Sequence, residues 1–291
     1  MKRNTIARII IFSLIAVILS GILVTGLLVD CFAFRDGNWD VNEVEGTVSS
    51  VGEVEADMVS SIQIEWASGN IRILPGDVDK ITFSESEVSK ENHRMVWKIS
   101  GNKLNLQFSK DGVFFTPFGT NITISKDLVI TVPKNWKCSD LSIEVASANV
   151  EIADLSITEV DFDGASGVCD FRNCAVDQLS VDTASGDIHF YGTLNKLDCD
   201  AASADCKIAV SNIPSHIELD SASGDLELTL PEDSGFRVSF STLSGDFDSE
   251  FPTSMSGGDY VCGDGRCRIE MDAMSGNVTL RKGQTSTDNT F

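Results

Sequence analysis

The stretch that decides the fold runs from Leu179 to Leu228 and reads LSVDTASGDIHFYGTLNKLDCDAASADCKIAVSNIPSHIELDSASGDLEL. It contains the motif A-S-[GA]-D three times, beginning at Ala184, Ala202 and Ala222. Variants of this motif return across the chain, eight in all, and successive motif serines lie 79, 19, 19, 18, 20, 21 and 31 residues apart. A repeat of about 20 residues indicates a stacked architecture. The motif serines are Ser68, Ser147, Ser166, Ser185, Ser203, Ser223, Ser244 and Ser275.

The residues around each motif serine follow a fixed pattern of apolar positions. The sixth and fourth residues before the serine are apolar in every copy, and so are the third and fifth after it, apart from Ser249. A spacing of two is the period of a β-strand, whose alternate side chains face the same way. Each repeat is therefore predicted to form a strand, a sharp corner and a second strand. Gly or Ala suits the crowded corner, and the following Asp or Asn is expected to bond its own local backbone.

A repeat of this size cannot bury its apolar face alone, but it can stack on its neighbours. We therefore predict an all-β protein whose residues 55–283 form one parallel β-solenoid with coils of about 20 residues. An antiparallel β-sandwich is the alternative, because Ile99–Leu104 and Cys262–Cys267 resemble hairpins.

The two irregular spacings predict departures from simple repetition. Between Ser68 and Ser147, the alternating runs Lys103–Phe108 and Ile122–Val132 are expected to be strands of degenerate coils or an inserted hairpin layer. The turn-rich stretch Ser254–Gly265 is expected to leave the stack as a lateral excursion. Residues 30–54 form a linker with a first strand region, and residues 284–291 form a polar tail.

Residues 9–29 form an uncharged and almost wholly apolar run of 21 residues, long enough to span a membrane as a helix. A cleavable signal peptide is the alternative, but its apolar region is normally only about 7–15 residues long. Lys2, Arg3 and Arg8 precede the run and Asp30 follows it. The positive-inside rule then predicts a single-pass cell-membrane protein with residues 1–8 in the cytoplasm and the C-terminal domain outside the cytoplasm.

The repeated pattern apolar-x-apolar-[DE]-x-A-S-G-[DN]-apolar-x-apolar, with the strand ends Val132-Pro133-Lys134 and Leu230-Pro231-Glu232, resembles a known group. It is similar to the bacterial putative-adhesin family of β-strand-repeat domains of unknown function, over roughly residues 55 to 283. This resemblance implies a solenoidal β-domain on a bacterial envelope, often behind a membrane segment, with no established catalytic residues. Some relatives accompany envelope-stress systems, which also suggests a regulatory role.

The chain is strongly acidic, with 22 Lys and Arg against 44 Asp and Glu and a net charge of −22. This excess of anions argues against a nucleic-acid partner. Part of it forms a column three residues before the motif serine, whose side chains are predicted to face outward. The column could bind cations such as Ca²⁺, but a solvated acidic face explains it better, since no compact metal-loop spacing accompanies it. The weak metal candidates are Asp163, Asp182, Asp200 and Asp220.

A second acidic column, which includes Asp205 and Asp225, follows the corner Gly or Ala. Carboxylates on adjacent coils could act on a polysaccharide, but Asn shares this column, and turn formation explains both residue types. No cofactor motif and no catalytic residue is predicted. Cys169, Cys199 and Cys206 occupy inward positions and are expected to be core residues. Cys262 and Cys267 flank Gly-Asp-Gly-Arg, and a disulfide between them is an open possibility.

These observations favour a non-enzymatic, membrane-anchored extracytoplasmic binding or scaffold module of the bacterial cell envelope. Its expected partners are the membrane and another envelope protein or a glycan. Two alternatives stay open: an accessory regulator of an envelope-stress signalling system, and a β-helical enzyme acting on polysaccharide.

Overall fold

The computed structural model describes residues 46–86, 88, 90–109 and 124–283. Within this part, the chain folds as β-strands with two short 3-10 turns, η1 (Ala56–Met58) and η2 (Glu91–His93). None of the helices in the described residues could cross a membrane. The predicted membrane-spanning helix at residues 9–29 and the polar tail at residues 284–291 lie outside the described residues.

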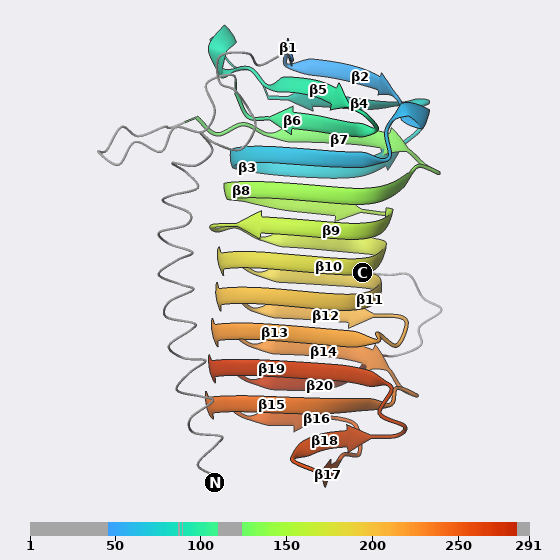
Figure 1. Ribbon diagram of the computed structural model, residues 1–291, viewed down its shortest axis with the longest axis vertical. Coiled ribbons are helices and arrows are strands. Elements are labelled where there is room, and N and C mark those ends of the chain that lie inside the picture. Colours follow the sequence, from blue (N-terminus) through green and yellow to red (C-terminus); the bar gives the residue numbers. More distant parts are fainter. Residues whose placement is uncertain (1–45, 87, 89, 110–123, 284–291) are drawn as a thin grey trace, which may run out of the picture.

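Strands from successive repeats stack along one long axis, as Figure 1 shows. Parallel pairing joins the coils, so the predicted β-solenoid is confirmed. The strands are β1 (Thr47–Val48), β2 (Val51–Glu55), β3 (Ser61–Gly76), β4 (Lys80–Glu85), β5 (Val96–Ser100), β6 (Lys103–Gln107), β7 (Leu128–Pro133), β8 (Lys137–Ala153), β9 (Ser156–Gly164), β10 (Cys169–Ser185), β11 (Ile188–Ser203), β12 (Cys206–Val210), β13 (His216–Ser223), β14 (Leu226–Pro231), β15 (Phe236–Ser244), β16 (Phe247–Ser249), β17 (Ser254–Ser256), β18 (Asp259–Cys262), β19 (Cys267–Ser275) and β20 (Val278–Gly283).

Two parallel ladders enclose the core. The first ladder consists of the segments before each motif serine, and the second ladder consists of the segments after it. The four predicted apolar columns point inward between the ladders and are buried, with Ile188 1% exposed. The column assignment is confirmed except in the outermost coil, where Phe240 and Phe247 are only partly buried.

The long gap after Ser68 supplies the N-terminal end of the solenoid. β6 and β7 pair in parallel with the two halves of β3, so they form one degenerate coil. β2, β4 and β5 add antiparallel strands beyond it. The sequence predicted either a degenerate coil or an inserted hairpin layer in this gap, and the structure contains both. Residues 122 and 123 of the second predicted strand lie outside the described residues.

The order of the coils at the other end differs from the order in the sequence. β19 lies between β13 and β15, and β20 lies between β14 and β16 (Figure 1). The hairpin of β17 and β18, which falls in the predicted excursion Ser254–Gly265, allows this exchange. β18 pairs antiparallel with the outer edge of β15, and the chain then returns as β19 along its inner edge.

The corners hold neighbouring coils close together. Gly186 has φ +148°, and a Cβ added there would lie 2.0 Å from the carbonyl oxygen of Gly167. The sequence predicted that the corner Asp and Asn residues would bond their own local backbone, but Asp205 and Asp225 bond the backbone of a neighbouring coil. Asp205 accepts from the backbone N–H of Asp225 at 2.9 Å, and Asp225 accepts from that of Asn277 at 2.7 Å. These side chains therefore stabilise the stack rather than the single bend.

Candidate functional site

The outward surface of the first ladder carries an uninterrupted row of acidic side chains. We call this surface the carboxylate face. Strand alternation places each acid one residue beyond a buried apolar side chain, so packing of the core fixes the row. The pairing register brings all seven members of the predicted acidic column together, one coil after another. From the N-terminal end, they are Glu65, Glu144, Asp163, Asp182, Asp200, Asp220 and Asp272.

A second column of the carboxylate face lies two residues before the first. It contributes Asp161, Asp198, Glu218 and Glu270, separated in places by Ser or Gln. A third column, two residues further back, contains basic residues near the C-terminal end. These are Lys196, His216, Arg268 and Arg237, which are cross-strand neighbours in that order. The carboxylate face is therefore acidic along its middle and basic along part of one border.

Burial, together with the crowding of like charges, raises the pKa values of the carboxylate face. Glu65 is only 8% exposed, and burial together with the charge of Glu144 raises its pKa to about 7. Partial desolvation and the neighbouring carboxylates Asp182 and Asp272 raise the pKa values of Asp163 and Asp220, respectively, to about 6. The pKa values of Asp182, Asp200 and Asp272 are raised for the same reasons. The ionised face stores repulsion that a bound cation would relieve.

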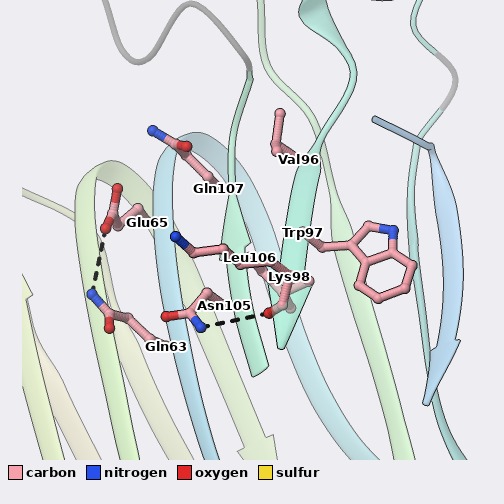
Figure 2. A pocket seen from close by; sticks show the side chains of 8 residues that line it. All are labelled: Gln63, Glu65, Val96, Trp97, Lys98, Asn105, Leu106 and Gln107. Atoms are coloured by element: carbon pink, nitrogen blue, oxygen red, sulfur yellow. Dashed lines mark hydrogen bonds between the residues drawn. The ribbon is translucent and has the colours of Figure 1, made fainter. Parts of the chain in front are cut away.

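A small pocket with polar and apolar lining residues lies at the N-terminal end of the carboxylate face (Figure 2). Gln63 donates to Glu65 at 3.4 Å, and Asn105 donates to the carbonyl oxygen of Lys98 at 3.5 Å. The side-chain oxygen of Gln107 is buried without a hydrogen-bond partner. Figure 2 shows the Trp97 indole directed away from these polar groups, and its ring packs edge-on against Phe83 on the other side of β5. The pocket is therefore lined by three carboxamides, one carboxyl and Lys98, together with the apolar residues Val96, Trp97 and Leu106.

A polar groove of about 430 Å³ lies on the second ladder, and the sequence analysis did not predict it. Arg72 and Arg172 both contact Glu151, and Arg172 also binds Asp170 at 2.6 Å. Arg72, Glu151 and Asp170 are cross-strand neighbours on three coils, and Arg172 lies two residues after Asp170 on β10, so the register of the coils brings the four side chains together.

The remaining predicted site residues have structural positions. The eight motif serines line the corner. Five of them form a continuous in-register row of Ser185, Ser203, Ser223, Ser275 and Ser244. Ser68 pairs in register with Ser147, and its hydroxyl donates to the carbonyl oxygen of Ile124 at 2.8 Å. The hydroxyl of Ser166 donates to the carbonyl oxygen of Ala146 at 3.4 Å.

Cys262 and Cys267 are both free and buried, so the structure does not form the disulfide that the sequence left open. The two cysteines pair with Phe236 from opposite sides of β15. Two strand spacings of about 4.8 Å each separate their Cα atoms. The sum, about 9.6 Å, exceeds the Cα distance that a disulfide can bridge. Cys169, Cys199 and Cys206 are buried core residues, as predicted.

The architecture defines the class of the protein as a β-solenoid repeat protein. The Toastrack DUF4097 family matches this chain over residues 59–196 and again over residues 138–281, and the chain belongs to that family. None of the curated proteins matches this chain.

Two bacterial proteins of known structure are similar to this chain. A putative adhesin from Bacteroides fragilis is 13% identical, with a TM-score of 0.50, over 81% of this chain and 98% of its own. A putative cell adhesion protein from Clostridium sporogenes is 12% identical, with a TM-score of 0.35, over 82% of this chain and 100% of its own.

Proposed function

We propose that this chain is a non-enzymatic binding or scaffold module of the bacterial cell envelope, anchored by residues 9–29 with its solenoid outside the membrane. The observation that supports binding most directly is the in-register row of acids from Glu65 to Asp272. The similarity to proteins described as adhesins agrees with such a role.

The carboxylate face suits a partner that presents cations at regular intervals. Its carboxylates are held on strands about 4.8 Å apart, so an extended basic segment could neutralise several of them at once. Burial and then the charges of neighbouring carboxylates raise the pKa values of Asp163 and Asp220, and a cationic partner would relieve the repulsion between these carboxylates. We therefore assign the partner to a basic segment of another envelope protein.

The corner carboxylates support a structural role rather than catalysis. The side chains of Asp205 and Asp225 each accept a backbone N–H from the neighbouring coil, which is the bond that a stacked corner requires. A screen of the purified chain against cell-wall and acidic polysaccharides tests the proposal. Hydrolysis that disappears in Asp205→Asn or Asp225→Asn, with the fold intact, would show that the protein is an enzyme.

Binding through the carboxylate face is tested with an oligolysine peptide. The purified full chain should bind the peptide, with affinity that falls as salt rises, because screening weakens exposed charge pairs. The triple variant Asp182→Asn, Asp200→Asn, Asp220→Asn should lose this binding. The matched control Asp57→Asn, Asp79→Asn, Asp233→Asn removes the same charge from exposed positions outside the face and should retain it. Equal losses in both variants would assign binding to net charge alone.

The membrane topology is tested by labelling an engineered thiol, Thr287→Cys, in a background without the native cysteines. A thiol reagent that cannot cross membranes should label intact cells. Labelling only after lysis would reverse the proposed orientation.

A further inference from the structure

Three potential metal ligands meet on the carboxylate face near the C-terminal end of the solenoid. His216 and Glu218 lie two residues apart on β13, so their side chains share the outward side of the strand. Glu270 on β19 is the direct cross-strand partner of Glu218. One ligand atom from each of the three residues lies within 4.8 Å of the other two, and His216 Nε2 is 2.9 Å from Glu218 Oε2.

The exchanged order of the last coils creates this cluster. If the coils stacked in sequence order, β15 would lie beside β13 and would place Ser239 opposite Glu218. Insertion of β19 puts Glu270 there instead, from 52 residues further along the chain. The sequence alone does not predict this cluster, since the ligand set exists only in the observed coil order.

The surroundings leave the three ligands accessible. The side chains of His216 and Glu270 are each 29% exposed, and that of Glu218 is 40% exposed. Lys196 and Arg268 flank His216 on the neighbouring strands, and Arg268 contacts one oxygen of Glu270. This contact leaves the second oxygen of Glu270 for another partner.

Further acids surround the cluster. Asp198 lies opposite Glu218 on its other side, and Asp220 and Asp272 follow in the adjacent column. These three carboxylates make the local potential more negative. They therefore favour binding of a cation despite the positive charges of Lys196 and Arg268 at the border of the cluster.

We propose that His216, Glu218 and Glu270 bind a divalent transition-metal ion of the Zn²⁺ class. An imidazole nitrogen with two carboxylate oxygens is a ligand set that such ions prefer, whereas Ca²⁺ takes oxygen ligands alone. Three protein ligands on an exposed sheet leave the remaining coordination positions to water. The site would join β13 to β19 and therefore the inserted coil to the rest of the solenoid.

The test is titration of the chelator-treated, purified full chain with Zn²⁺ and, separately, with Ca²⁺, each followed by calorimetry, and with Co²⁺, followed by its visible absorption. We expect one equivalent to bind, with affinity reduced about tenfold or more in His216→Gln and in Glu270→Gln. His189→Gln is the matched control, because His189 is an outward histidine on the second ladder, and it should bind like the unmodified chain. Melting temperatures without metal show whether each variant remains folded.

Three results would overturn the proposal: no binding of one equivalent, equal affinity in His216→Gln, or equal affinity for Ca²⁺ and Zn²⁺. The last two would assign any bound ion to the carboxylates alone. Because the titration uses only the chain and the metal, its outcome is independent of whether oligolysine binds the carboxylate face.

Discussion

The Lys126 ammonium lies 2.5 Å from the Glu85 carboxylate, and both side chains are 0% exposed. Lys126 also donates to the carbonyl oxygens of His93, at 2.8 Å, and Phe108. Its Nζ lies 4.8 Å from the ring centroid of Trp66. Burial lowers the pKa of Lys126, and Glu85 opposes that change. The N-terminal end of the core is therefore closed by a buried ion pair with several polar partners.

Removal of one member of this pair should destabilise the fold strongly. Lys126→Met leaves Glu85 buried without its counter-charge, and we expect a loss of about 3–5 kcal/mol in the free energy of unfolding, measured by chemical denaturation. Lys80→Met is the control, because Lys80 pairs with Glu53 and Glu55 at the surface and its loss should change little. Similar losses in both variants would contradict the buried role of Lys126.

Inward and outward strand positions should respond differently to a change of charge. Ile188→Asp buries an uncompensated carboxylate and should cost more than about 3 kcal/mol of unfolding free energy. Asp182→Asn removes one charge from a crowded row and should cause no loss. Thermal denaturation of both variants checks this pair, and equal melting temperatures would refute the inward and outward assignment.

The repeat made the solenoid and its four core columns predictable, because the same alternation recurs around every motif serine. The order of the last coils was not predictable. Val238 and Phe240 fit the inward columns as well as Ile269 and Met271 do, so apolar pattern alone accepts either coil next to β13. The cluster around His216 depends on that order and was missed with it.

The non-repeating segments hid other features. A lysine in a sequence indicates a surface position, and Lys126 becomes a core residue only because Glu85, 41 residues away, is buried beside it. Glu65 was predicted to lie outward with the other acids, and it does belong to that column. It is 8% exposed because it lies in the pocket that β5 and β6 border at the N-terminal end.

Disulfide trapping can establish the coil order. Glu227 on β14 is the cross-strand partner of Thr279 on β20, whereas β20 separates Glu227 from Asp248. The variant Glu227→Cys with Thr279→Cys should oxidise to a crosslinked form, because adjacent strands place the two Cα atoms within disulfide range. Glu227→Cys with Asp248→Cys should stay reduced. Electrophoresis without reductant after digestion distinguishes them, and the opposite pattern would restore the sequence order.

The corner glycine Gly186 should matter more than Gly101, which lies in the turn between β5 and β6. Gly186→Ala places a Cβ 2.0 Å from the carbonyl oxygen of Gly167 at a positive φ, so it combines a clash with backbone strain. Gly101→Ala also has a positive φ, +65°, but no atom lies within 4 Å of the added Cβ. We expect about 1–2 kcal/mol for the strain alone at Gly101 and a clearly larger loss at Gly186. Equal losses in urea unfolding would remove the argument for tight corner stacking.

The stability of the solenoid should fall as pH rises through the neutral range. The pKa values of Glu65, Asp163 and Asp220 in the folded state, about 7, 6 and 6, exceed their values in an unfolded chain. The folded state therefore holds these protons more tightly. Their contribution to stability is complete below about pH 4 and is lost as pH rises through about 6 to 7.

This dependence can be assigned to the carboxylate face with one variant and one control. Glu65→Gln should raise the melting temperature at pH 8 relative to the unmodified chain and should flatten the fall between pH 5 and pH 8. Glu232→Gln, at an exposed position in the turn after β14, should leave the profile unchanged. Added salt should raise the melting temperature at pH 8 more than at pH 5, because only the ionised carboxylates repel one another. A profile that rises with pH in the unmodified chain would contradict the crowding of the acidic row.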